Sequence, residues 1–299
     1  MYESIVQDVV AALDGNRDKT FRIGIGLQDG ASILVSVLAE LRRGIRTSTL
    51  TLVIYTSREG FELPASAGTI LRWSNQPENA MLSDFQARKL DAIIRGQLSS
   101  ANFLEELKYQ FSIKNVCRLA LLTSSSGQDF FFAPVGIDEA RNIEEKELLI
   151  ELAIKLLDRL GIVPSFYVLS AGRLDDAGRD EHIARSILDA VEIVEAMRAA
   201  HEGLAIQHGE ILIENAFENG ANVILAPDGV SGNLIYRTLL HLGGGHSHGA
   251  YYLNEELPGP VMDTSRAGTV EEYAGAVVLA LRLLVVKDET GLVVPSDDE

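Results

Sequence analysis

The chain has 299 residues, 46% of them hydrophobic and 23% charged, which is the composition of a folded globular protein and not of a disordered one. Its 26 basic and 43 acidic residues give a formal net charge of −17, so most of its surface repels the phosphates of nucleic acids and of anionic membranes. We therefore expect neither as a partner. An anionic ligand would need a local cluster of Arg side chains and backbone N–H groups.

The location of the protein is predicted from its cysteine content and its apolar runs. Cys117 is the only cysteine, so no disulfide can form within the chain. No apolar run approaches the roughly 18 residues of a membrane-spanning helix, and Glu3 and Asp8 stand where an export signal carries Lys or Arg. We expect a cytoplasmic protein.

Short β-rich runs alternate with segments of helical periodicity along the chain. The periodicity predicts helices over residues 2–13, 31–42, 100–109, 143–160, 179–200, 231–242 and 270–286. Apolar and β-branched runs predict strands over residues 21–25, 51–55, 90–94, 119–122, 130–133, 166–169, 223–225 and 261–263. Strands separated by helices indicate an α/β fold with a mainly parallel sheet, in which ligands bind at the carboxyl ends of the strands.

Two motifs of cofactor and metal sites are incomplete. Gly24 and Gly26 follow the first strand, but Asp29 stands where a dinucleotide fingerprint has its third glycine. His246 and His248 form a His-x-His pair that no cysteine supports, and we interpret it as part of a glycine-hinged loop. We expect neither a nicotinamide cofactor nor a metal.

Arg95 and Gly96 directly follow the strand predicted at 90–94. A charged residue at this edge of a sheet is either solvated or faces the ligand cleft, and the sequence leaves both interpretations open. In the second, Arg95 and Gly96 contribute to substrate binding.

A strand-to-helix junction at residues 226–233 has the composition of an anion site. Ser231 can cap the predicted helix, and Gly232 lets a ligand approach the backbone. The free N–H groups of a first helical turn bind anions, so Ser231, Gly232 and Asn233 are candidate anion-binding residues. The alternative is a helix cap without a ligand.

The junction at residues 263–268 repeats this arrangement and adds an arginine. Ser265 can cap the following helix or donate to an anion, and Arg266 can form paired hydrogen bonds with a phosphate or carboxylate. The alternative is a surface arginine paired with Asp263 or Glu271.

Five runs stand out by their order and spacing, residues 166–170, 208–211, 220–227, 231–236 and 260–266. Together they resemble a known superfamily, the phosphate acetyl/butyryl transferases. Two further runs, 91–96 and 132–139, resemble the narrower methanogenesis marker protein 4 family, also called MtxX and named as a methyltransferase subunit. With them the resemblance covers nearly the whole chain.

The resemblance implies a two-lobed α/β/α fold with mainly parallel sheets, as in phosphate acetyltransferases and in isocitrate and isopropylmalate dehydrogenases. One lobe would comprise residues 1–138 and 254–299, and the other residues 139–253. The ligand cleft would lie between the two lobes.

The resemblance also implies roles for single residues. In the acyltransferases a Ser-Arg pair binds the acyl phosphate, and that pair corresponds to Ser265 and Arg266. A carboxylate that takes the thiol proton of coenzyme A corresponds to Glu272, which is one methylene longer than the usual Asp, and Ala267 replaces a glycine. Ser170, the last residue of a matching run, is a further candidate for substrate binding.

Three functions follow from the resemblance. The chain would be a group transferase acting as a methyltransferase subunit of methanogens with an anion-binding cleft, or a phosphate acyltransferase that moves an acyl group between phosphate and coenzyme A. The third is a non-catalytic sensing or assembly subunit. The expected ligand is a small anion, coenzyme A or another thiol is a candidate cofactor, and other methyltransferase subunits and a second copy of the chain are the expected partners.

Overall fold

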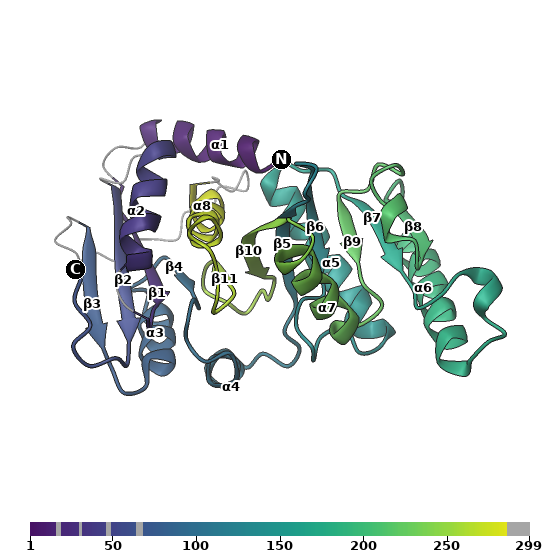
Figure 1. Ribbon diagram of the computed structural model, residues 1–299, viewed down its shortest axis with the longest axis horizontal. Coiled ribbons are helices and arrows are strands. Elements are labelled where there is room, and N and C mark those ends of the chain that lie inside the picture. The colour runs from purple at the N-terminus through teal and green to yellow at the C-terminus, as the bar shows by residue number, and fades with distance from the viewer. Residues whose placement is uncertain (16–18, 30–31, 46–48, 64–67, 286–299) are drawn as a thin grey trace.

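The computed structural model describes residues 1–15, 19–29, 32–45, 49–63 and 68–285. They form one continuous 11-stranded sheet with helices on both faces (Figure 1), in the strand order β3-β2-β1-β4-β11-β10-β5-β6-β9-β7-β8. None of the helices formed by these residues has the length and hydropathy of a membrane span.

The sheet consists of two parallel halves joined by antiparallel strands. The first half is parallel throughout and comprises β3 (Thr69–Trp73), β2 (Leu50–Thr56), β1 (Phe21–Gly26), β4 (Ala92–Ile94) and β11 (Val261–Asp263). The second half is also parallel and comprises β6 (Asp129–Ala133), β9 (Val223–Leu225), β7 (Ser165–Leu169) and β8 (Ala205–Glu210). Between them β10 (His246–Tyr252) and β5 (Arg118–Thr123) pair antiparallel with their neighbours. The predicted α/β fold with a mainly parallel sheet is confirmed.

The two faces of the sheet are covered differently. One face carries a single apolar core under α1 (Tyr2–Gly15), α2 (Ser32–Gly44), α5 (Ile143–Leu160), α6 (Glu181–Ala200) and α8 (Val270–Val285). The other face carries two separate cores, one under α3 (Pro77–Gln86) and α4 (Ser100–Phe111), the other under α7 (Gly229–His241). The layers are therefore α/β/α, and the second face is left open between α4 and α7.

The alternation of side chains along β5 shows what lies in this opening. Leu119 and Leu121 belong to the continuous core, whereas Ala120 and Leu122 belong to the core under α7. Because successive side chains of a strand point to opposite faces, Arg118 lies on the face that α4 and α7 leave open.

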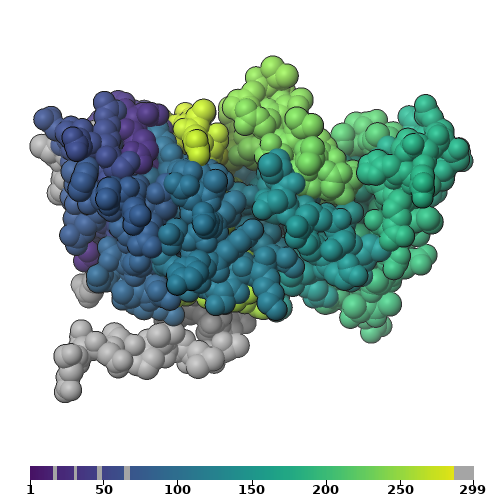
Figure 2. Space-filling view, turned by 90° about the horizontal axis from the view of Figure 1, so that it is seen from below, coloured from purple at the N-terminus to yellow at the C-terminus, as the bar shows by residue number. Residues whose placement is uncertain are grey.

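The C-terminal β11 and α8 lie in the middle of the molecule. β11 pairs with β4 of the first half and with β10, and α8 packs against β10, α1 and α2. In the space-filling view the yellow residues lie between the purple and blue N-terminal part and the green part of the chain (Figure 2). The division into lobes of residues 1–138 with 254–299 and 139–253 stays a prediction, because one sheet runs through both.

Every predicted helix and strand is present, with ends that agree or differ by at most two residues. The elements of the described residues that were not predicted are β3, α3, β8, β10 and the short 3-10 helices Leu174–Asp176 and Ile213–Asn215. The interpretation of residues 246–248 as a loop is wrong, because they begin strand β10. His246 and Ser247 pair with β5, and Ala250 and Tyr251 pair with β11. Residues 31 and 286, at predicted helix ends, lie outside the described residues.

Candidate functional site

A cleft of about 780 Å³ occupies the opening between α4 and α7. Ser100, Ala101 and Leu104 line it from α4, and Asn233, Tyr236 and Arg237 from α7. The segments that follow β4, β6 and β11 also line it, together with Arg118 of β5 and Ala250 of β10, so both halves of the sheet present carboxyl ends of strands to the same cleft. This is the position at which α/β sheets bind ligands.

A chain of four buried, alternating charges lies at the floor of the cleft, and three of them, Arg95, Asp263 and Arg118, line it. Arg95 Nε donates to Asp263 Oδ1 at 2.5 Å, and Arg118 Nη1 donates to Asp263 Oδ2. Arg118 Nε donates to Glu139 Oε1 at 2.5 Å. The four side chains are all buried and their formal charges cancel, so each is paired as a buried charge must be.

Asp263 is held as a carboxylate by its two partners. Burial alone raises its pKa, but the guanidinium groups of Arg95 and Arg118 outweigh burial and lower the pKa of Asp263 below its ordinary value. Arg95 also donates to the carbonyl oxygens of Gly96, Leu98 and Thr264. Arg95 is therefore neither solvated nor free: it lines the cleft as a paired cation that ties β4 to β11.

Arg118 is a cleft residue that the sequence analysis missed. An added Cβ at Gly136 would lie 2.0 Å from Arg118 Nη2, so only glycine at 136 leaves room for the guanidinium. The available signal was an arginine directly before the apolar run 119–122, comparable to Arg95 directly after its apolar strand.

Arg266 lies at the rim of the cleft on the loop that follows β11. It is exposed and forms no ion pair with any described residue. The alternative of a pair with Asp263 does not occur, because Arg95 and Arg118 hold both carboxylate oxygens of Asp263. Arg266 is thus a cation available to a ligand, and the same holds for Arg237 among the described residues.

Ser265 and Glu272 are linked to each other beneath this loop. The Ser265 N–H donates to Glu272 Oε1 at 2.9 Å, and the Tyr236 hydroxyl donates to the same oxygen at 3.2 Å. Glu272 is only 3% exposed, and burial raises its pKa. Ser265 lines the cleft, whereas Glu272 stands behind it and fixes the Ser265 backbone relative to α7.

The junction before α7 differs from its prediction. The helix begins at Gly229, and Asp228 caps it by accepting from the Ser231 N–H at 2.8 Å. Ser231 Oγ also donates to Asp228, at 2.8 Å, so Ser231 is not the cap. An added Cβ at Gly232 would lie 2.1 Å from the Pro134 carbonyl oxygen, and this glycine therefore permits close packing of helix and loop.

Asn233 is the residue of this group that reaches the cleft. It lines the wall and donates from Nδ2 to the Val135 carbonyl oxygen at 2.8 Å. This bond ties α7 to the loop after β6, which forms the neighbouring part of the wall.

The structure places Gly96 and Ser170 outside the cleft lining. Gly96 has a φ of +61° and packs directly on the Gly26 carbonyl, so it serves the junction of β1 and β4. Ser170 is buried at the end of β7, where its hydroxyl bonds to the Gly172 carbonyl and to His208 Nε2, both at 2.8 Å.

The two members of the predicted His-x-His pair lie in different surroundings, although regular strand alternation would put both on one face, because the register of β10 against β5 shifts between Ser247 and Ala250. His248 is buried, stacks on Tyr2 and bonds to Thr123, and burial lowers its pKa to about 4. His246 is exposed. Within the described part of the chain no three His, Cys, Asp or Glu side chains converge as metal ligands would.

The fold and the cleft define a protein with the architecture of the phosphotransacylases. A branched-chain phosphotransacylase from Enterococcus faecalis superposes on 89% of this chain and 100% of its own with a TM-score of 0.64 at 16% identity. A phosphotransacetylase from Streptococcus pyogenes superposes on 96% of this chain and 98% of its own with a TM-score of 0.63 at 14% identity. At these identities the likeness shows the fold alone.

The sequence relatives define the family. The chain is 41% identical over 210 residues to "Putative methyltransferase mtx subunit X" of Methanosarcina mazei, covering 70% of this chain and 72% of that one. It is 42% identical over 216 residues to the protein of the same name from Methanosarcina acetivorans, covering 72% and 75%. No family model matches the chain. The chain belongs to the mtx subunit X family, as the resemblance implied.

The charge chain under the cleft makes a prediction about stability. We expect Asp263→Asn to lower the free energy of unfolding by about 3–5 kcal/mol, because it leaves two buried guanidinium groups without their shared carboxylate. Urea unfolding at neutral pH measures the change. Glu255→Gln, which removes the exposed partner of Lys155, is the matched control and should cost less than about 1 kcal/mol.

The pH dependence of this contribution follows from the lowered pKa of Asp263. A carboxyl group whose pKa is lowered by folding contributes its full stabilisation of the folded state at pH values above its pKa in the unfolded chain, about 3.9. This contribution is lost as the pH falls through the pKa in the folded state. The difference in stability between wild type and Asp263→Asn should therefore shrink below about pH 4. A difference that stays constant into acid would contradict the assignment.

Proposed function

We propose that this protein is a methyltransferase subunit that binds a small anionic ligand, a phosphate or a carboxylate, in the cleft between α4 and α7. The observation that carries the proposal is Arg266, an exposed guanidinium at the rim that has no ion-pair partner among the described residues. Below it the charges of the floor are already balanced, so an incoming anion meets a net positive site.

The charge of the cleft supports the proposal because it opposes that of the molecule. Four arginines line the cleft, Arg95, Arg118, Arg237 and Arg266, against two acids, Asp138 and Asp263. The chain as a whole has a formal charge of −17. Positive charge concentrated at one cleft attracts an anion that the remaining surface repels.

The roles of the cleft residues follow from their positions. Arg266 would form paired hydrogen bonds with the anion, and Ser265 would donate from its hydroxyl. Asn233 would hold the wall in place through Val135, and Arg95 and Arg118 would supply the fixed floor. Ser231, Gly232, Gly96 and Ser170 would act on the packing around the cleft and not on the ligand.

Methyl transfer and the partner subunits are proposed from the names of the relatives. "Methyltransferase mtx subunit X" describes a subunit, so we propose that the chain works with other methyltransferase subunits, with a thiol as a candidate acceptor. We further propose that the protein is a homodimer in the cytoplasm and that its cleft lies between two lobes. Nothing in the cleft calls for a metal.

A phosphate acyltransferase is the second candidate, favoured by the shared fold and by Ser265 and Arg266 at the cleft. In that reaction Glu272 would take the thiol proton of coenzyme A. Its burial behind the loop, with one oxygen occupied by the Ser265 N–H, favours a positioning role instead. A subunit that binds the anion without turnover is the third candidate.

Anion binding is tested by calorimetric titration of inorganic phosphate into wild type and Arg266→Ala. A hydrogen bond to a charged group contributes roughly 1.5–3 kcal/mol, so we expect the variant to bind about tenfold to a hundredfold more weakly. Arg43→Ala is the control, because Arg43 is exposed and pairs with Glu40 on α2. Equal affinity of wild type and Arg266→Ala would refute the proposed anion site.

The acyltransferase candidate is tested by thioester formation from acetyl or butyryl phosphate and coenzyme A. If Glu272 is the base, Glu272→Gln loses turnover by about 100-fold or more while phosphate affinity is retained. If Glu272 positions the loop, Glu272→Gln keeps the bond from Ser265, because an amide oxygen also accepts. Absence of turnover in wild type excludes this reaction for these substrates and leaves the methyltransferase subunit and the sensor.

A further inference from the structure

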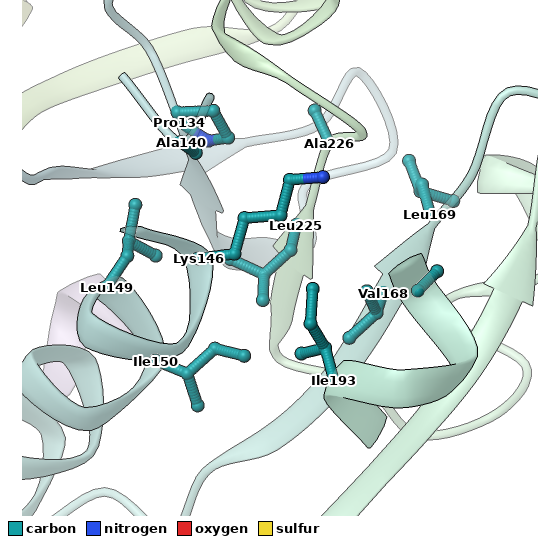
Figure 3. Close-up of a pocket in the computed structure, with 11 residues that line it drawn as sticks. Pro134, Ala140, Lys146, Leu149, Ile150, Val168, Leu169, Ile193, Leu225 and Ala226 are labelled. Atoms are coloured by element: carbon teal, nitrogen blue, oxygen red, sulfur yellow. The ribbon is translucent and has the colours of Figure 1, made fainter. Parts of the chain in front are cut away.

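The cavities of the molecule differ in what they can hold. The pocket between α5 and α6, where aliphatic side chains surround Lys146 (Figure 3), has a free volume of about 10 Å³, room for one water molecule. A different cavity, of about 340 Å³, shares Arg266 with the cleft and has the size of a small-molecule site. We call it the amide pocket, after the side-chain amides in its lining, Gln28, Asn75, Gln97 and Asn102.

The amide pocket lies at the carboxyl ends of four neighbouring parallel strands. Its lining includes Gln28 after β1, Ser57 after β2, Asn75 after β3 and Gln97 after β4. The strand order reverses at β1, because β2 and β3 lie on one side of it and β4 on the other. Such a reversal leaves a crevice between the loops that follow the two strands, and α/β sheets bind ligands there.

Gln97 holds the two loops of this crevice together. Its Oε1 accepts from the Gln28 N–H at 2.6 Å and from the Asp29 N–H at 2.9 Å. The segment after β1 is thereby fixed to the segment after β4. The position of the amide pocket is thus set by the backbone of both loops.

The lining of the amide pocket is suited to hydroxyl groups. Amides and the hydroxyls of Ser57 and Ser99 both donate and accept hydrogen bonds, as the hydroxyl groups of a ligand do. Among the described lining residues Pro77 is the one apolar side chain, and none is aromatic. A flat heterocycle would lack a face to stack on, so the lining favours a hydroxylated chain or ring.

Glu78 adds a buried acceptor to these groups. It lies in the first turn of α3 and is 8% exposed. Its Oε1 accepts from the Ser99 N–H at 2.9 Å, and no described residue donates to its Oε2. A carboxylate only accepts, so this oxygen suits a hydroxyl group and repels a second anionic group of a ligand. Carboxylates bind ribose hydroxyls in a comparable place in dinucleotide-binding sheets.

The amide pocket and the cleft meet at the start of α4. Ser99 and Asn102 line the amide pocket, whereas Ser100 and Ala101 line the cleft. Arg266 lines both. A ligand whose anionic group is bound by Arg266 can therefore extend into the amide pocket.

Two amides of this pocket are available to such a ligand. Asn75 and Asn102 are exposed, and the side chain of neither makes a hydrogen bond with a described residue. They come from opposite sides of the pocket in the sequence, after β3 and in α4.

We propose that the ligand of this protein is a phosphate monoester of a polyol, such as a sugar phosphate, whose hydroxyl groups occupy the amide pocket while Arg266 binds its phosphate. This inference rests on the proposed anion site at Arg266 and adds the chemical class of the ligand. The amides of Asn75 and Asn102 and the free oxygen of Glu78 bind the hydroxyl groups.

The test compares two phosphate monoesters by calorimetric titration into the full-length protein. Ribose 5-phosphate carries hydroxyl groups, and n-butyl phosphate carries the same anionic group on a chain without them. Since each neutral hydrogen bond contributes about 0.5–1.5 kcal/mol, several together should make ribose 5-phosphate bind about tenfold more tightly or better. Equal affinities for the two esters would overturn the proposal.

Asn102→Ala and Asn75→Ala assign the preference to the amide pocket. Each should weaken binding of ribose 5-phosphate about twofold to tenfold and leave n-butyl phosphate unchanged. Folding should be unaffected, because neither side chain bonds to a described residue. Asn219→Ala is the control, since Asn219 is exposed and bonds only to the Asn215 carbonyl at the other end of the molecule. A preference that survives both pocket variants would contradict the assignment.

Arg266→Ala separates this inference from the proposed function. The variant should weaken binding of both esters alike. If wild type binds both esters equally and Arg266→Ala binds neither, the anion site stands and the polyol pocket is refuted. If Arg266→Ala binds both esters as wild type does, the anion site is refuted, and so is a ligand shared between the two cavities.

Discussion

Asp263 is the residue on which the arrangement of the cleft depends. Its carboxylate bridges Arg95, which follows β4, and Arg118, which begins β5. These strands belong to different parts of the sheet, separated by β11 and β10. One buried carboxylate therefore connects the parallel first half of the sheet to the antiparallel strands, at the place where the helices of the second face leave it uncovered.

This bridge also decides which charges a ligand can use. Buried guanidinium groups must be paired, and Arg95 and Arg118 are paired within the protein. Both oxygens of Asp263 are taken by Arg95 and Arg118, so Arg266 stays at the edge of the cleft without an ion-pair partner among the described residues. The site combines a rigid, neutral floor with an exposed cation, an arrangement suited to holding an anion in a fixed position without a large change in the protein.

The sequence predicted the layers of the fold because apolar periodicity and strand–helix alternation are local properties. It identified Arg95, Ser265, Arg266 and Asn233, which the structure brings to one cleft, because residues after strands gather at such edges. The place of Arg118 in the cleft was not predicted because its partners Glu139 and Asp263 are 21 and 145 positions away in the sequence. Ser231 was misassigned as a cap because the helix begins two residues earlier, at Gly229, where Asp228 is the cap and accepts from the Ser231 N–H. β10 was missed because His246 and Gly249 interrupt its pattern, while hydrogen bonds from β5 sustain the strand.

The central claim is that an anion binds at Arg266 above the Arg95–Asp263–Arg118 bridge. The most direct test is a crystal structure of the protein with tungstate, a phosphate analogue whose anomalous scattering locates the ion without reference to the protein density. We predict one strong anomalous peak within hydrogen-bond distance of the Arg266 guanidinium and the Ser265 hydroxyl. A peak elsewhere on the molecule, with the cleft empty at the same concentration, would contradict the account.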